Sequence, residues 1–264
     1  MDHEEVLTLF DRRMRRDAAS DNSGTVVERT GGVGHTGAVV RQSGGPHDWN
    51  GILWSDLDEE SAPAAVAAQV AHFTALGREF EWKHYSHDRP AALPDLLLAA
   101  GFVPEPAEAL MVAEAAALTA PAELPEGVRL VPVTDAAGVE LMAAVHEQAF
   151  GSDGGWLRQR LLAQLTETPD EVVAVVAMAG DVPVSAARME LPPGKEFAGL
   201  WGGGTAEAWR GKGIYRALVA HRARIAAARG YPYLQVDASD DSRPILHRLG
   251  FVQLSITTPY VHKP

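Results

Sequence analysis

The residues with the clearest chemical potential form a short basic run, Arg-Gly-Lys-Gly-Ile-Tyr, at positions 210–215. The run separates a segment with strand character, residues 197–205, from a helical pattern that begins at Ile214. Glycine adopts backbone angles that other residues avoid, and it lets a ligand approach the main chain closely. The unpaired N–H groups and the dipole of a helix start attract an anion. The run therefore predicts a turn whose amides bind a pyrophosphate.

The charge distribution supports an anionic ligand. Residues 209–230 contain six basic side chains and no acidic one: Arg210, Lys212, Arg216, Arg222, Arg224 and Arg229. The whole chain has a net charge of −12, so the remainder outside this segment carries −18. A cationic patch on an acidic protein favours a small anionic ligand over nucleic acid. We expect Arg222, Arg224 and Arg229 to lie on an exposed helix face.

The run and its surroundings resemble the GNAT superfamily of acetyl-CoA-dependent N-acetyltransferases, whose signature is R/Q-x-x-G-x-G/A at a strand-to-helix turn. Arg210, Gly211 and Gly213 fit that signature, while Tyr215 stands where the family has a small residue. A strand predicted at residues 233–236 and a helix at 241–249 follow. Leu249-Gly250-Phe251 then resembles the end of the family's second motif. The resemblance implies an α/β fold, with a mixed sheet flanked by helices.

By this resemblance the co-substrate is acetyl-CoA, bound between two splayed parallel strands at residues 197–205 and 233–236, without a metal. The strand before the turn would hydrogen-bond pantetheine, and the turn amides would bind the pyrophosphate. Ser239 stands where the family often has an asparagine anchor. The cofactor-binding residues that we expect are Gly203, Thr205, Arg210, Gly211, Lys212, Gly213, Ile214, Tyr215, Arg216 and Ser239.

The resemblance implies that an amine attacks the thioester directly, which requires a base for the amine and a proton for the departing thiolate. The family's usual tyrosine donor falls at Leu246, which cannot donate a proton. Tyr215 or a water remains as the donor. The side chains that could act as the base, directly or through water, are Glu190, Glu207, Glu196, His146 and Glu147. Trp201, beside the glycine run, is the aromatic residue expected to reach the cleft.

An internal repeat suggests two related halves. Gly101-Phe102-Val103 recurs as Gly250-Phe251-Val252, and each triplet lies between a short helix and a strand. We expect a degenerate GNAT-like domain at residues 1–112, a linker rich in alanine and proline at 113–127, and a catalytic domain at 128–264. The first half has residues 56–61, an acidic loop, where the second has the glycine run. A divergent α/β cap without common origin is the alternative for this half.

The periodicity predicts further elements in each half. In the first half we expect helices at 4–16, 62–76 and 93–100, and strands at 26–27, 38–40, 52–54, 80–85 and 109–112. In the second we expect helices at 136–150 and 156–165, and strands at 128–133, 172–179 and 182–191.

Composition limits the remaining possibilities. The chain has no cysteine, which removes disulfides, thiolate catalysis and Cys-zinc sites. The acidic N-terminus lacks the pattern of a signal peptide, and no apolar stretch is long enough to span a membrane, so we expect a cytoplasmic protein. The expected partner is a small-molecule or peptide amine, with neither nucleic acid nor membrane, and the protein is expected to be a monomer or a homodimer.

Two other functions stay open on the sequence. The missing tyrosine and the unassigned base are compatible with a non-catalytic acyl-CoA-binding regulatory protein. A nucleotide-binding α/β domain of another kind would also use a glycine-rich turn, although the Lys-Ser/Thr ending of a P-loop is absent.

Overall fold

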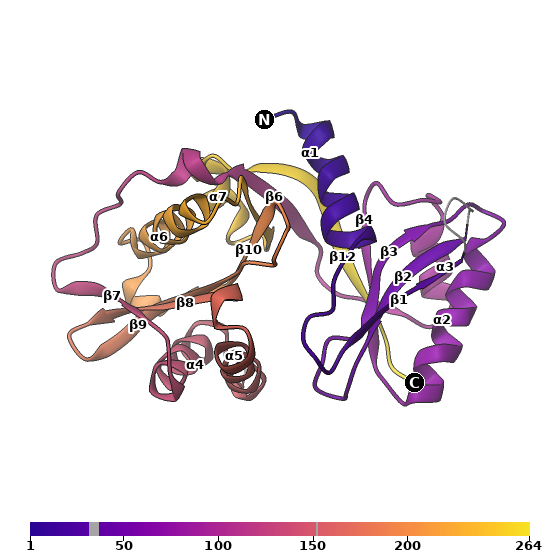
Figure 1. Cartoon of the computed structure of the whole chain (residues 1–264), viewed down its shortest axis with the longest axis horizontal. Helices are drawn as coiled ribbons and strands as arrows, with labels where there is room; N and C mark the ends of the chain where they lie inside the picture. The colour runs from indigo at the N-terminus through magenta and orange to yellow at the C-terminus, as the bar shows by residue number, and fades with distance from the viewer. Residues whose placement is uncertain (32–36, 152) are drawn as a thin grey trace. The chain divides into compact units, whose positions relative to one another are not determined.

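The structure is a computed structural model that describes residues 1–31, 37–151 and 153–264 (Figure 1). It divides into two compact units. Unit 1 contains residues 1–110, 237–243 and 253–264, and unit 2 contains residues 111–236 and 244–252. The expected catalytic domain, residues 128–264, therefore differs from the compact units in its last part. The physical reason is that the C-terminal strand completes the sheet of unit 1.

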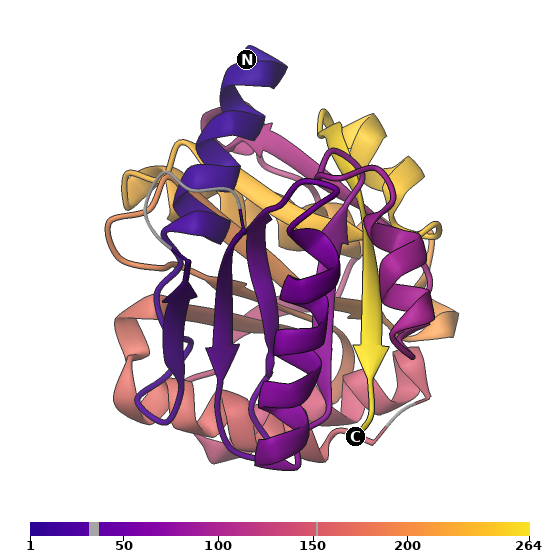
Figure 2. The same cartoon turned by 90° about the vertical axis from the view of Figure 1, so that its right-hand side faces the viewer.

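Unit 1 is a sheet with two helices on one face. Its elements are α1 (His3–Phe10), η1 (Asp11–Arg16), β1 (Val26–Thr30), β2 (Ala38–Ser43), β3 (Gly51–Asp56), α2 (Ala62–Leu76), β4 (Phe80–Tyr85), α3 (Leu93–Ala99), β5 (Val103–Pro104) and β12 (Val252–His262). The strand order is β1-β2-β3-β4-β12, and β12 is antiparallel to β4 from Thr257 opposite Tyr85 to His262 opposite Phe80. Figure 2 shows α2 and α3 together on one face of this sheet.

The core of unit 1 explains that arrangement. Phe73 of α2 stacks on Phe80 of β4, with 4.2 Å between ring centroids, and both rings are fully buried. Leu93 and Leu97 of α3 join the same cluster, as does Tyr260 of β12. Burying such side chains contributes about 1.5–3 kcal/mol each, so the helices and the C-terminal strand depend on one shared core.

Unit 2 is a sheet covered on both faces. After β6 (Glu108–Glu114), which runs from unit 1 into unit 2, it has η2 (Ala115–Leu118), β7 (Val128–Pro132), α4 (Ala136–Phe150), α5 (Gly155–Glu167), η3 (Pro169–Glu171), β8 (Val172–Ala179), β9 (Val182–Glu190), β10 (Phe197–Thr205), η4 (Glu207–Trp209), α6 (Ile214–Ala228), β11 (Tyr233–Ala238) and α7 (Arg243–Leu249). The strand order is β11-β10-β9-β8-β7.

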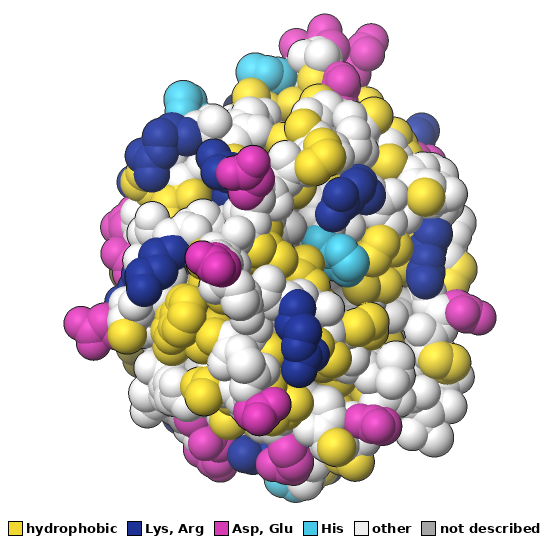
Figure 3. Space-filling view, turned by 90° about the vertical axis from the view of Figure 1, so that its left-hand side faces the viewer, with side chains coloured by type: hydrophobic (Ala, Val, Ile, Leu, Met, Phe, Trp, Pro, Cys, Tyr) yellow, Lys and Arg dark blue, Asp and Glu magenta, His cyan; other side chains and the backbone are white. Residues whose placement is uncertain are grey.

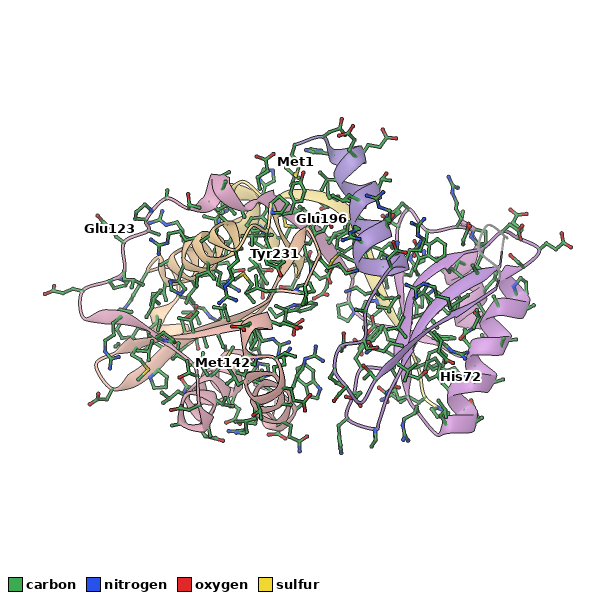
Figure 4. All side chains as sticks on the ribbon, in the orientation of Figure 1. Met1, His72, Glu123, Met142, Glu196 and Tyr231 are labelled. Carbon is green, nitrogen blue, oxygen red and sulfur yellow. The ribbon has the colours of Figure 1, made fainter. Side chains whose placement is uncertain are left out.

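The alternation of side chains along β8 separates the two faces of this sheet. Val176 packs in the cluster that contains Met142 of α4 and Leu161 of α5, whereas Val175 packs with Leu218 of α6. Figure 1 shows α4 and α5 on one side of the sheet and α6 on the other. In Figure 4 the labelled Met142 lies where α4 meets the sheet. Because both faces are covered, β8 is an almost continuous apolar run.

The structure corrects one expectation about the basic helix. Arg224 and Arg229 are exposed as expected, but Arg222 is only 1% exposed. Its guanidinium donates hydrogen bonds to the carbonyl oxygens of Leu218 and Arg188, at 3.1 and 2.8 Å. Burial lowers the pKa of Arg222 to about 10. Arg222 therefore fastens α6 to the β9 backbone rather than contributing to a surface patch.

Candidate functional site

The site of unit 2 begins where two parallel strands separate. β10 and β11 pair only at Phe197–Tyr233, Ala198–Leu234 and Gly199–Gln235, and this register ends well before β10 does. The register of β10 with β9 also shifts between Trp201 and Gly204, at the expected glycine kink. The result is an opening between the strands whose vertex lies at Gly199 and Gln235. This opening agrees with the two splayed parallel strands that the sequence predicts.

The glycine-rich turn ends at the start of α6 with its amides available. Gly211 and Gly213 have φ angles of +74° and +83°, which L-amino acids rarely adopt, and a Cβ on Gly211 would meet no atom of the described chain within 4 Å. Glycine is thus required by the backbone conformation and leaves the space above the turn open. Gly213 is the N-cap of α6 and provides no capping side chain. The first amides of this 15-residue helix can therefore bind an anion, so a pyrophosphate fits the residues present.

The basic side chains of the turn have different roles. Arg210 donates hydrogen bonds to the carbonyl oxygens of Thr205 and Ala149, which ties the end of β10 to α4. Lys212 lies over the ring of Trp209, with 4.5 Å to the centroid. Arg216 is exposed, and its Nη2 lies 3.7 Å from the position of a Cβ on Gly213. Of these three, Arg216 is the one whose side chain lies directly at the start of the helix.

Tyr215 lies beside the opened strand. Its Cε2 is 2.8 Å from the position that a Cβ on Gly203 would occupy, so only glycine at 203 admits the ring. Burial raises the pKa of Tyr215 above its ordinary value. The phenol therefore stays protonated at neutral pH and can donate a proton. Leu246, in the position of the family's tyrosine, is fully buried and His247 beside it is exposed.

Two of the carboxylates proposed as bases lie in different surroundings. Glu190 accepts hydrogen bonds from Arg160 and Gln164 at 3.3 and 3.0 Å, and Arg188 lies 4.0 Å away. Burial opposes ionisation, but the two arginines and these hydrogen bonds outweigh it and leave the pKa of Glu190 below its ordinary value. A carboxylate held this way is a weak base. Glu207 is exposed in η4, where its carbonyl oxygen accepts from the Arg210 amide.

Two expected residues have mainly local contacts. Thr205 Oγ1 is 2.8 Å from Ser185 Oγ, which joins β10 to β9 beyond the kink. Ser239 follows β11 in the segment assigned to unit 1, and its Oγ is 3.3 Å from Ser242 Oγ.

The sequence gives no indication of a pair of N–H groups at the vertex of the opening. A Cβ on Gly199 would lie 2.7 Å from Trp201 Nε1 and 2.9 Å from Gln235 Nε2, so both groups lie close to one point. Trp201 Nε1 is buried and has no hydrogen-bond partner within the part of the chain that the structure describes. Trp201 was expected at the cleft, but no local pattern could indicate its convergence with Gln235.

The segment between the two halves lies along α6 rather than free in solvent. Leu118 is 3.9 Å from the Cβ position of Gly250, and the Glu123 carbonyl oxygen is 3.8 Å from that of Gly213. Figure 4 shows the Glu123 side chain directed away from the body of the unit. The segment and α6 enclose a groove of about 480 Å³ lined by Ala117, Leu118, Ala120, Pro121, Ala122, Glu123, Arg216, Val219, Ala220 and Leu249. Eight of these ten residues have apolar side chains, Glu123 and Arg216 add charged ones, and the groove is next to the glycine turn.

Unit 1 has a comparable pair of strands but a different loop and a filled opening. β3 and β4 are parallel and pair only at Gly51–Glu81 and Ile52–Trp82. Beyond this pairing Arg15 donates a hydrogen bond to the Leu53 carbonyl oxygen at 3.1 Å. Its guanidinium carbon also lies 3.8 Å from the centroid of the Tyr85 ring.

The Arg15 guanidinium also binds both oxygens of Asp88 at 2.8 Å. The loop before α2 is acidic, and in it Asp58 and Ser61 bond each other. An acidic loop at a helix start repels an anion, which agrees with a degenerate first half.

Unit 1 also contains a hydrogen-bonded Ser-His-Asp chain that the sequence did not suggest. His87 Nδ1 is 2.9 Å from Ser255 Oγ, and His87 Nε2 is 2.8 Å from Asp11 Oδ2. Ser255 is only 4% exposed, and its hydroxyl donates to the Ile256 carbonyl oxygen. A buried hydroxyl engaged with a carbonyl is not an accessible nucleophile, so this chain ties η1 to β12.

Two features that other kinds of site require are absent from the described residues. Across residues 1–31, 37–151 and 153–264, no group of three or more His, Cys, Asp or Glu side chains could hold a metal ion. In the same residues no helix combines the length and the apolarity needed to cross a bilayer. On the face shown in Figure 3, basic and acidic side chains are interspersed rather than gathered by sign.

Comparison with known proteins defines the class of the site. Residues 139–251 match the Acetyltransferase (GNAT) family. The matched segment includes the opened strands, the glycine turn and α6. No curated protein matches the chain in sequence.

The similar solved structures extend over both halves. A GCN5-related N-acetyltransferase from Kribbella flavida is 18% identical, with a TM-score of 0.68, over 99% of this chain and 94% of its own. A tandem GNAT protein from the clavulanic acid biosynthesis pathway is 13% identical, with a TM-score of 0.60, over 92% and 85%. A GCN5-related N-acetyltransferase from Sphaerobacter thermophilus is 13% identical, with a TM-score of 0.59, over 99% and 86%. These structures confirm the expected fold, a mixed α/β arrangement over two halves that is similar to the fold of a tandem GNAT protein.

Proposed function

We propose that this protein is an N-acetyltransferase that moves the acetyl group of acetyl-CoA to a primary amine by direct attack. The observation that carries the proposal is the combination, in one GNAT domain, of splayed β10 and β11 with an uncapped α6 behind two positive-φ glycines. The first feature offers free strand edges to pantetheine, and the second offers amides to a pyrophosphate.

In this proposal different groups of residues bind different parts of acetyl-CoA. The amides at the start of α6 and Arg216 bind the pyrophosphate, and the backbone of Gly203 and Thr205 pairs with pantetheine. The groove between residues 117–123 and α6 accepts the nucleotide end, because it continues directly from the turn through Arg216 and Glu123. This assignment gives the linker a binding role in addition to its covalent one.

The chemistry needs few groups from the protein. Acetyl-CoA supplies an activated thioester whose thiolate departs when a neutral amine attacks. Tyr215 is our candidate to protonate that thiolate, because its ring lies against Gly203 and its pKa is raised. Glu190 is bound by Arg160 and Gln164, and we assign it a positioning role; the amine proton then passes to water.

The proposal is tested by titration calorimetry with acetyl-CoA, CoA, ATP and NAD. Micromolar affinity for acetyl-CoA, about −8 kcal/mol, is expected for the wild type and should be lost in Gly211→Asp. Gly180→Asp is the matched control, since Gly180 also has a positive φ and open space around it, in the β8–β9 turn. No binding by the wild type, or equal loss in both variants, rejects the cofactor assignment.

An amine panel then tests turnover. Released CoA is easily detected through its thiol because the chain has no cysteine. Acetyl-CoA binding without turnover of any amine would favour the second candidate, a non-catalytic acyl-CoA-binding regulatory protein. That candidate is supported by one observation, the fully buried Leu246 where the family places a tyrosine proton donor.

A further inference from the structure

The opened part of β10 is covered by different helices on its two faces. Gly203 lies against the Tyr215 ring of α6. Gly204 lies against α4, where the Phe150 Cε2 atom is 2.9 Å from the position that a Cβ on this glycine would occupy. Gly202 is exposed, and a Cβ on it would meet no atom of the described chain within 4 Å. The kink is therefore open to solvent and lies between α6 on one face and α4 on the other.

His146 lies on the face of α4 that packs against this part of the sheet. Met142, His146 and Ala149 have the i, i+4 and i+7 spacing that places side chains on one side of a helix. Met142 belongs to the core cluster between α4 and the sheet, and Ala149 Cβ is 2.9 Å from the Cβ position of Gly204. The centroid of the His146 ring lies 4.9 Å from that of Phe150, and His146 is partly exposed. His146 is therefore beside the opened strand, on the face opposite α6.

The surroundings of His146 favour its neutral form. Burial and the Arg188 guanidinium lower the pKa of His146 from its ordinary 6.5, and Glu147 opposes them only in part. The charged side chains on α4 and on the elements next to it are Glu140 and Glu147 of α4, Arg158 and Arg160 of α5, Arg188 and Glu190 of β9, and Arg210 of the glycine turn. The imidazole is neutral at pH 7 and can accept a proton.

The carboxylates considered as bases are less well placed. Glu147 accepts a hydrogen bond from Arg158 at 2.9 Å, which lowers its pKa. Glu190 is held by its own arginine contacts. Glu196 precedes β10 at the end where this strand is still paired with β11 (Figure 4), and Glu207 is exposed in η4, after β10 ends. His146 thus combines a neutral ring with a position at the opened strand.

We propose that His146 is the general base that takes a proton from the acceptor's ammonium group on the α4 side of β10. This inference rests on the proposed function. His146 accepts the first amine proton in place of water, and the freed lone pair attacks the thioester carbonyl, so that the C–N bond forms and the C–S bond breaks. The departing thiolate takes the Tyr215 proton on the α6 side. The second proton of the nitrogen returns to Tyr215 through water, and His146 releases its own to solvent, so one proton leaves per acetyl group transferred.

His146→Gln tests the inference with the amine of the panel that has the highest kcat/KM. A base in the protein lets the ammonium form react, so the wild-type kcat/KM should be level from pH 7 to the pKa of that amine. It should decrease below pH 6.5, because a protonated His146 cannot accept a proton. Without the base only the neutral amine reacts, so kcat/KM of the variant should rise about tenfold per pH unit up to that pKa. At pH 7 the variant should lose about 100-fold.

His221→Gln is the matched control. Burial and the arginines at 224 and 222 lower the pKa of His221 as well, but this residue lies on α6. The control should keep the wild-type pH profile, and both variants should bind acetyl-CoA with the wild-type Kd. Added imidazole should restore activity to His146→Ala, a rescue that a packing role would not show. A level profile in His146→Gln, an equal loss in the two glutamine variants, or no rescue by imidazole would overturn the inference.

The failure of the proposed function gives a different result. A wild-type protein that turns over no amine would reject the acetyltransferase proposal, and the assignment of a base with it. Turnover by the wild type, with an unchanged pH profile in His146→Gln, would keep the proposed function and reject only the role of His146.

Discussion

At the scale of single residues, Tyr215 combines a position beside the opened strand with a pKa raised by burial. We expect Tyr215→Phe to lower kcat by about 100-fold, the lower end of what general acid catalysis supplies, while the Kd for acetyl-CoA stays the same. A donor must be protonated, so its loss of activity on the alkaline side falls above the ordinary tyrosine pKa. Steady-state kinetics between pH 7 and 10 should therefore show no decrease of kcat from deprotonation of Tyr215.

The control for that measurement is Tyr231→Phe. The Tyr231 hydroxyl donates to the Pro192 carbonyl oxygen at 3.0 Å, away from the opened strand. Its removal should change stability slightly and kcat not at all. If Tyr215→Phe reduced kcat by less than three-fold, a water molecule would be the better candidate for the proton donor.

Glu190 could have either a structural or a catalytic role, and the pH dependence of stability distinguishes the two. Its pKa is lowered by Arg160 and Arg188, so it contributes stability above its ordinary pKa of 4.5. That contribution is lost as the pH falls through the lowered value. Glu190→Gln should reduce the free energy of unfolding by about 2 kcal/mol at pH 7, the contribution of hydrogen bonds to a charged group, and the difference from wild type should shrink below pH 4.5. Urea unfolding at pH 7 and pH 4 measures both quantities.

Glu140→Gln provides the comparison for this experiment. Glu140 pairs with Arg158 at 2.9 Å on the surface, where an ion pair contributes about 0–1 kcal/mol. Equal destabilisation by the two variants would contradict the buried role of Glu190. If the decrease of kcat/KM at low pH disappeared in Glu190→Gln and persisted in Glu140→Gln, Glu190 would again be the candidate for the general base.

At the scale of elements, the start of α6 depends on one backbone conformation. Gly213 has a φ of +83° and is the N-cap, so alanine there forces the turn and the first amides to shift. We expect Gly213→Ala to lower stability by about 1 kcal/mol and to weaken acetyl-CoA binding about ten-fold. Gly77→Ala at the end of α2, with a φ of +62°, should lower stability similarly without changing affinity. Calorimetry and thermal unfolding of both variants give the comparison, and equal affinities would contradict it.

Elements of this protein were predictable where the pattern was local. The periodicity located α2 and α6, and the spacing of glycines placed the turn before α6. Residues 4–16 were expected as one helix, and the structure has α1 followed by the π-helical η1, with Arg15 buried. A long basic side chain indicates a solvated surface in sequence, so neither Arg15 nor Arg222 could be recognised as a buried side chain that binds backbone carbonyls.

At the scale of the whole molecule, what sequence could not supply is pairing between distant segments. The repeat of Gly-Phe-Val indicated two halves, and similar tandem structures agree with it. The two expected domains are each continuous in sequence, so residues 253–264 are expected in the second half. β12 instead pairs with β4, and Thr257 and Tyr260 are buried in unit 1. The convergence of Trp201 and Gln235 on Gly199 was hidden for the same reason, because it depends on the register of two strands.

The C-terminal strand β12 completes the sheet of unit 1, although it follows unit 2 in the sequence. Deleting residues 253–264 removes the strand next to β4, so the β4 amides and the fully buried Trp82 should become accessible. Hydrogen exchange should then show lost protection across residues 80–85, while α4 and β8 of unit 2 keep theirs. Deleting only residues 263–264, which lie beyond β12, is the control and should change neither. Unchanged protection of residues 80–85 in the longer deletion would mean that unit 1 folds without its C-terminal strand, and the contiguous boundary at residue 112 would then be the better description.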